Sequence, residues 1–134
     1  MMELPEFERG LSARVELTVT DADTAQSLGS GDVPVLGTPR VLALAEAATV
    51  AATARQMPGG LTTVGTRAEI DHKAPTPVGR RVTALATLAK VEGRKLVFDV
   101  VVRDGEDLVA EVRVERVVLE RRRFIEKALG SSDS

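Results

Sequence analysis

Alternating apolar and polar positions along the chain predict five β-strands. Over 14–20, Val and Leu alternate with polar residues, which is typical of a half-buried strand. Beyond position 60 the chain is rich in Val, Thr, Leu and Ala, and it predicts further strands at 62–71, 81–91, 95–103 and 108–119. Short glycine-containing sequences at 92–94 and 104–106 suit hairpin turns. We therefore expect the last three strands to form an antiparallel meander.

The stretch between the first two strands predicts one long apolar helix. Thr38-Pro39 is typical of a helix start, because a threonine oxygen can cap free N–H groups and proline suits the first turn. From Val41 to Ala54 the chain is rich in alanine, and Pro58-Gly59-Gly60 ends the pattern. We expect this helix to be buried on nearly every side. The preceding residues, 21–37, have the polar and glycine-rich composition of a loop.

The order of these elements predicts an α+β domain of the hotdog fold. A strand, a long helix and four more strands allow a five-stranded antiparallel sheet to wrap around one apolar helix. Two other α+β layouts fit the same order. A short charged helix is expected over 120–128. We expect a single domain over 1–134, with its core at about 11–126 and flexible ends at 1–10 and 129–134.

Composition and charge exclude several classes of function. The formal net charge is −2, and the chain has three Phe and neither Tyr nor Trp, which argues against nucleic-acid binding. The absence of cysteine excludes disulfides, thiolate metal sites and cysteine nucleophiles. No segment has the roughly 20 apolar residues that a membrane span needs, and the acidic start does not read as a secretory signal. We expect a soluble, cytoplasmic protein.

One carboxylate interrupts the predicted apolar helix. Glu46 is the only charged residue between Val41 and Ala54. A buried carboxylate loses several kcal/mol of hydration unless a partner compensates for it. Glu46 is therefore a candidate catalytic residue, although a wet edge of the helix or a structural ion pair with an arginine also explains it.

Two further side chains can contribute chemistry to the same site. His72 is the only histidine, and it ends a predicted strand, where a surface or structural role is equally open to it. The Thr38 hydroxyl can cap the helix or orient a substrate carbonyl or a water. Eight residues separate Thr38 from Glu46, which is roughly 12 Å along a continuous helix. A shared site therefore requires a loop that folds back or a second subunit.

Two residues are candidates for substrate binding. Gly65 lies near a strand start, where a glycine permits close approach to the backbone or marks a bulge. Arg116 lies where strand alternation gives way to an apolar run, so its side chain either turns inward toward a carboxylate or decorates an edge strand. His72 fits neither HxxxH nor HExxH spacing, and we expect no metal site.

Several segments together resemble the fluoroacetyl-CoA thioesterase-like family. These segments are Gly37-Thr38-Pro39 with Glu46 after it, Thr63–Thr66, His72 with Ala74–Gly79, Val91–Lys95 and Glu115–Val118. The resemblance covers about residues 11–126. It implies a hotdog fold and a homodimer, or a larger assembly, with the active site near the dimer interface.

The same resemblance implies hydrolysis of an acyl-CoA thioester, with coenzyme A as part of the substrate and no other cofactor. The family's Thr–Glu–His set falls on Thr38, Glu46 and His72. Its glycine near the thioester carbonyl falls on Gly65, and its late-strand arginine falls on Arg116.

One departure from the family concerns the acyl pocket. The enzyme specialised for fluoroacetyl-CoA has an aromatic lid, whereas this chain has no aromatic residue between Phe7 and Phe98. Its corresponding loop reads Gly29-Ser-Gly-Asp-Val-Pro34. We therefore expect another short acyl group as substrate. A protein that binds acyl-CoA or another small ligand without hydrolysing it is the alternative, because fold alone does not determine function.

Overall fold

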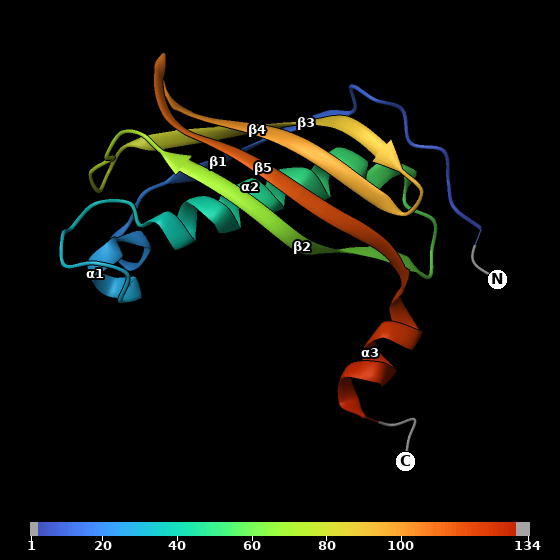
Figure 1. The fold of residues 1–134 in the computed structure, drawn as a ribbon. Coiled ribbons are helices and arrows are strands. Elements are labelled where there is room, and N and C mark those ends of the chain that lie inside the picture. The colour runs from blue at the N-terminus through green and yellow to red at the C-terminus, as the bar shows by residue number, and fades with distance from the viewer. Residues whose placement is uncertain (1–2, 131–134) are drawn as a thin grey trace.

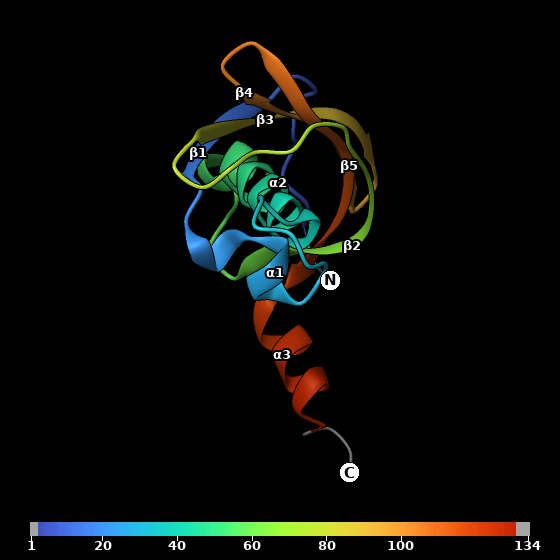
Figure 2. The same cartoon turned by 90° about the vertical axis from the view of Figure 1, so that its left-hand side faces the viewer.

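A curved antiparallel sheet wraps around one long helix in the computed structural model, which describes residues 3–130 (Figures 1 and 2). The strands are β1 (Ser12–Thr18), β2 (Leu61–His72), β3 (Arg81–Glu92), β4 (Lys95–Asp104) and β5 (Asp107–Glu120). The helices are α1 (Ala25–Leu28), α2 (Thr38–Thr53) and α3 (Arg121–Leu129). Every predicted strand and both predicted helices are present. Residues 1–2 and 131–134, which belong to the ends expected to be flexible, lie outside the described part.

The sheet has the strand order β1-β3-β4-β5-β2, so β1 and β2 form its edges. Two tight turns join β3, β4 and β5 into the predicted meander. Gly93 and Gly105 occupy these turns with φ angles of 61° and 62°, a left-handed conformation that glycine adopts without steric cost. β2 pairs antiparallel with β5, from Leu61 opposite Glu120 to His72 opposite Ala110.

The core lies between the concave side of the sheet and one side of α2. Fully buried alanines on both elements, such as Ala45 and Ala84, let the helix approach the sheet closely around Phe98. The expectation that α2 is buried on nearly every side is wrong. Ala47 and Ala51 are exposed, and Val50 is 47% exposed, because the sheet curls around only one side of the helix.

The segment predicted as a loop before α2 contains ordered structure. A 3-10 turn at Asp21–Asp23 precedes α1, and the Asp23 carboxylate holds it in place. That carboxylate accepts hydrogen bonds from Thr20 N and Oγ1 at 2.7 and 2.9 Å, and it pairs with Arg40 Nε at 3.0 Å. Burial raises the Asp23 pKa, but these bonds outweigh it, so the pKa lies below its ordinary value. The sequence pattern Thr-x-x-Asp, which is typical of a capping box, predicts this turn, although it was missed in the expectation of a loop.

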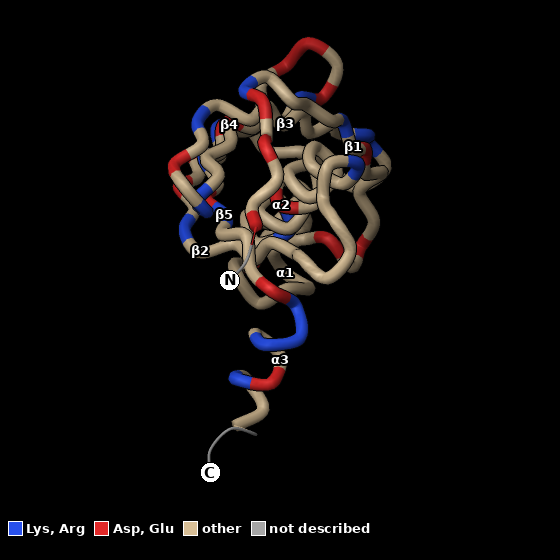
Figure 3. Tube along the Cα trace, turned by 90° about the vertical axis from the view of Figure 1, so that its right-hand side faces the viewer, with Lys and Arg blue, Asp and Glu red and all other residues tan. Residues whose placement is uncertain are grey.

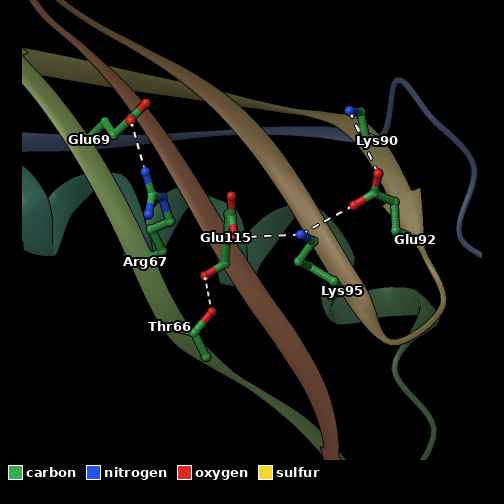
Figure 4. Close-up of polar contacts among 7 residues, drawn as sticks. All are labelled: Thr66, Arg67, Glu69, Lys90, Glu92, Lys95 and Glu115. Atoms are coloured by element: carbon green, nitrogen blue, oxygen red, sulfur yellow. Dashed lines mark hydrogen bonds and ion pairs between the residues drawn. The ribbon is translucent and has the colours of Figure 1, made fainter.

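Ion pairs cover the convex side of the sheet, away from α2. Figure 4 shows Lys95 pairing with Glu92 at 3.2 Å and Arg67 pairing with Glu69 at 3.2 Å. These side chains are solvent-exposed, so each pair contributes little to stability. Between residues 3 and 130, no helix has the length and apolar character to cross a membrane.

Candidate active site

Thr38 and His72 meet at the N-terminal end of α2. The Thr38 Oγ1 lies 2.8 Å from His72 Nδ1. The helix cap itself is Gly37, which offers no side-chain bond, so the expectation that Thr38 caps the helix is wrong. Thr38 is already the first helical residue, and from there its hydroxyl bonds the imidazole of β2. The contact orients the imidazole ring.

A pocket of about 270 Å³ opens beside this pair. Its walls include small aliphatic and proline side chains from two loops, namely Val33, Val35, Ala74 and Pro75, together with Thr38 and His72. The second ring nitrogen of the histidine, Nε2, is buried and has no hydrogen-bond partner among the described residues. Because Thr38 holds Nδ1, Nε2 is the ring nitrogen whose hydrogen-bonding capacity is unused among the described residues.

Burial lowers the pKa of His72 below its ordinary value of 6.5, and the Ala74 backbone opposes this only in part. The imidazole is therefore neutral at neutral pH. A neutral imidazole carries one N–H and one lone pair, so it can donate or accept a proton according to its tautomer. This is the property that a general acid or base requires.

A second polar cluster surrounds Glu46 in the middle of α2. The Glu46 Oε2 accepts a hydrogen bond from Arg116 Nη1 at 3.1 Å, across the space between α2 and β5. Arg116 is 6% exposed and turns inward, whereas the Glu46 side chain is 38% exposed. Burial lowers the pKa of Arg116 and the Glu46 charge opposes this, and a guanidinium stays protonated in proteins. The Glu46 carboxylate is therefore partly solvated and pairs with a cation whose position is fixed.

Thr63 completes the hold on this arginine, a role that sequence reasoning missed. Its Oγ1 accepts a hydrogen bond from Arg116 Nε at 2.9 Å, and its carbonyl accepts one from Nη2 at 3.1 Å. All three nitrogens of the guanidinium therefore have a fixed acceptor. The spacing of Thr63 and Arg116 along the chain carries no signal for this contact, which depends on the pairing of β2 with β5.

Gly65 brings the main chain of β2 against the Glu46 carboxylate. A Cβ at this position would collide with Glu46 Oε2, and it would lie 3.3 Å from Arg116 Nη1. Its φ angle is not positive, so glycine is needed here for space rather than for backbone conformation. The close approach places the Gly65 backbone and the Glu46 carboxylate side by side, so that both can face one bound group.

A β-bulge in β2 puts both clusters on the same side of the sheet. Gly65 pairs with Arg116 but Arg67 pairs with Glu115, so one extra residue interrupts the ladder between them. Without it, Gly65 and His72 would face opposite sides, because they are seven residues apart and side chains alternate. The bulge makes both face α2.

Within this chain, the five predicted residues form two groups rather than one. Thr38 contacts His72, and Glu46 contacts Arg116 beside Gly65. α2 is continuous over Thr38–Thr53, so about 12 Å of helix separates the two groups. Glu46 is not part of the pocket wall around His72. Among residues 3–130, no three His, Asp or Glu side chains are grouped to hold a metal ion.

Comparison with known proteins identifies the family. A model of the fluoroacetyl-CoA-specific thioesterase family, FlK, matches residues 19–122. A fluoroacetyl-CoA thioesterase from Streptantibioticus cattleyicolor is 37% identical over 90 residues, which cover 67% of this chain and 65% of that protein. The match thus spans slightly less than two thirds of that relative.

Solved structures agree with the sequence match. A solved structure of the fluoroacetyl-CoA thioesterase FlK is 28% identical with a TM-score of 0.86, covering 96% of this chain and 99% of that one. A hot-dog-like protein from Thermanaerovibrio acidaminovorans is 25% identical with a TM-score of 0.86, covering 96% of this chain and 95% of its own. The expected hotdog fold is confirmed. The chain belongs to the fluoroacetyl-CoA-specific thioesterase family.

Proposed function

We propose that this protein hydrolyses a short acyl-CoA thioester without a metal ion, through Thr38, Glu46 and His72. In this reaction water adds to the thioester carbonyl carbon and the C–S bond breaks, which releases a carboxylic acid and the thiol of coenzyme A. The observation that carries the proposal is the Glu46 carboxylate, which Arg116 holds directly against the Gly65 backbone. Family membership supports thioester hydrolysis as the reaction class.

A homodimer would complete the site. Both groups lie on the same two elements, α2 and β2, with Thr38 and His72 at one end and Glu46 and Gly65 further along. A two-fold axis midway between them would bring the partner's Thr38 and the partner's His72 opposite Glu46. Two features favour this axis: β2 is an edge strand that can pair with another β2, and α2 exposes small apolar residues around Glu46.

Each residue would then have a defined role. Glu46 acts either as the nucleophile or as the base that takes a proton from water. His72, held by Thr38, delivers a proton to the departing thiolate through Nε2. The Gly65 N–H stabilises the negative charge on the carbonyl oxygen, and Arg116 keeps the carboxylate in place.

The walls of the pocket favour a short acyl group. Val33, Val35 and Ala74 are small and aliphatic, and such walls discriminate by only about 1–3 kcal/mol per methylene. Solved FlK variants include complexes with fluoroacetate and CoA and with acetyl-CoA. The loop over 29–34 has no aromatic residue to surround a fluorinated group. We therefore expect hydrolysis of several short acyl-CoAs without preference for fluoroacetyl-CoA.

The direct test is a panel of acetyl-, fluoroacetyl-, propionyl- and butyryl-CoA with release of free thiol as the readout. The wild type is expected to release thiol, and Glu46→Ala is expected to lose at least a thousandfold in kcat, as removal of a nucleophile or base does. If the wild type binds these compounds but releases no thiol above the Glu46→Ala rate, the protein is a binding module and the enzymatic proposal fails.

Mixing two inactive variants tests the composite site. Glu46→Ala retains His72 and His72→Ala retains Glu46, so a mixed dimer contains one intact site only if the two residues come from different subunits. Random reassociation makes half of the dimers mixed, so about a quarter of wild-type activity is expected to return. A site confined to one protomer predicts no recovery after mixing.

A further inference from the structure

Helix α3 projects from the domain (Figures 1 and 3), and its apolar side chains are exposed. None of its residues is buried, and Phe124, Ile125 and Leu129 are 41%, 47% and 77% exposed. These three residues and Ala128 fall on one side of the helix at helical spacing. Phe124 is one of only three aromatic residues in the chain, so its exposure is unusual for this molecule.

Interactions within α3 do not account for its stability. The helix has nine residues, fewer than the roughly 12–15 that an isolated helix needs in water. Its first turn contains Arg121, Arg122 and Arg123 at the positive end of the helix dipole, and its N-cap, Glu120, makes no side-chain bond. A surface that packs on the apolar side of α3 and carries negative charge would stabilise this short helix and compensate for the arginines in its first turn.

The attachment of α3 indicates where this surface lies. Arg121 N donates to Gly60 O at 2.9 Å, so α3 begins beside the start of β2. In the dimer proposed above, on which this step rests, antiparallel pairing places the far end of the partner's β2 next to this point. That far end carries His72 and the pocket formed with the loop over 29–35.

The region around that pocket is complementary to α3 in charge and polarity. Residues 20–37 include three aspartates and no lysine or arginine. Asp23 pairs with Arg40, but Asp21 and Asp32 have no ion pair among the described residues. Leu28 and Val33 in the same segment are 42% and 48% exposed. This combination matches an apolar helix side bordered by arginines.

We propose that α3 of each subunit docks on the 28–33 segment of the other subunit and closes the outer side of its acyl pocket. Phe124 thereby supplies an aromatic wall that the loop over 29–34 lacks. A second copy of this chain therefore covers the apolar side of α3. Phe124 contacts the substrate's acyl group across the interface and sets acyl-chain preference.

Disulfide cross-linking tests the contact directly, because the chain has no cysteine of its own. The double variant Phe124→Cys/Val33→Cys is expected to form an intermolecular disulfide under mild oxidation. The matched control is Phe124→Cys/Leu85→Cys, whose second position is 37% exposed on the convex side of the sheet. Both single variants serve as further controls. Cross-linking no greater than in these controls, in a protein that is dimeric by light scattering, would overturn the docking.

Kinetics tests the role in the pocket. Phe124→Ser is expected to raise KM for butyryl-CoA roughly tenfold and to change KM for acetyl-CoA less, since loss of one aromatic contact is worth about 1.4 kcal/mol. Leu85→Ser, which also removes an exposed apolar side chain but lies on the convex side of the sheet, is expected to leave both values unchanged. Equal effects of the two variants would contradict the proposal.

The outcomes separate this inference from the proposed function. A wild type without thioesterase activity removes the proposed function, while the cross-link still reports on docking. An active dimer in which Phe124→Ser behaves as wild type retains the proposed function and removes this inference. Binding of α3 to anionic phospholipid vesicles without any specific cross-link would assign the helix to a membrane surface, and this would also refute the docking.

Discussion

The two polar groups of the site differ in how the fold holds them. Each of the three guanidinium nitrogens of Arg116 has a hydrogen-bond acceptor on α2 or β2. Because Gly65 has no side chain, its backbone lies directly against Glu46, the carboxylate that pairs with Arg116. His72 is held through one side-chain contact, with Thr38, and borders an open pocket. The group around Glu46 therefore has a fixed geometry, whereas the group around His72 is held less tightly and borders a pocket.

This difference suggests a division of work between the two ends of α2. A carboxylate that attacks a carbonyl, or activates water beside it, must be aligned with the reacting atom. An imidazole that transfers protons needs a pKa near or below neutrality and a free ring nitrogen, both of which His72 has. Neither group contains both functions, which is the physical basis for proposing a site shared between subunits.

Outside the three proposed catalytic residues, adding a methyl group at Gly65 should have the largest effect. Gly65→Ala places a Cβ where Glu46 Oε2 lies, so the carboxylate must move. A displacement of about 1 Å costs roughly a hundredfold in rate, and we expect at least that loss in kcat/KM. Gly59→Ala is the matched control, because a Cβ there meets nothing within 4 Å. Similar activity of the two variants would mean that the close approach at Gly65 has no catalytic role.

Loss of the Thr63 hydroxyl should be the next largest effect. Thr63→Val removes the acceptor of Arg116 Nε and leaves that buried donor without a partner. We expect a loss of about 1–3 kcal/mol in the free energy of unfolding, measured by urea denaturation, and a lower kcat. Thr62→Val, one residue away in the same strand, is the control. A stability loss confined to the Thr62 variant would disprove the role given to Thr63.

Loss of the Thr38 hydroxyl should affect activity more than stability. Thr38→Val removes the contact with His72 Nδ1 at an exposed position, so the ring loses its orientation. We expect kcat to fall about fivefold, since such a bond is worth about 1 kcal/mol, with little change in urea midpoint. Thr38→Ser should restore most of the rate. A serine variant as slow as the valine variant would show that the hydroxyl is not what matters.

Protonation of His72 should have the smallest effect. It should slightly lower the free energy of unfolding at acid pH and produce an acid limb in kcat/KM. Its folded pKa lies below 6.5, so the folded state binds protons less readily than the unfolded state. The resulting stability is complete above pH 6.5 and is lost as pH falls toward the folded pKa. Because His72 is the only histidine, His72→Asn should remove this dependence below pH 6.5. A wild-type acid limb of kcat/KM above pH 6.5 would contradict the lowered pKa.

Much of the fold could be predicted from the sequence because it depends on local patterns. Period-two alternation marks β1, and glycines that favour left-handed turns separate β3, β4 and β5. The alanine-rich run of α2 also reads directly as a helix. The burial of α2 was mispredicted, because composition gives the polarity of a helix but not which of its sides another element covers. The 3-10 turn at Asp21–Asp23 could have been predicted, because its Thr20–Asp23 capping contacts are local. Only the ion pair of Asp23 with Arg40, seventeen residues further on, has no local signal.

For the site, the sequence alone determined which side chains are available: one histidine, one carboxylate in an apolar helix and no thiol. Only the tertiary structure decided their grouping. The pairing of β2 with β5 brings Thr63 to Arg116, and one extra residue after Gly65 turns His72 toward α2. These contacts join residues more than 30 positions apart, and a single bulge inverts which side of the sheet a strand residue faces. No local pattern encodes either, because both depend on the register of strands that meet only in the folded chain.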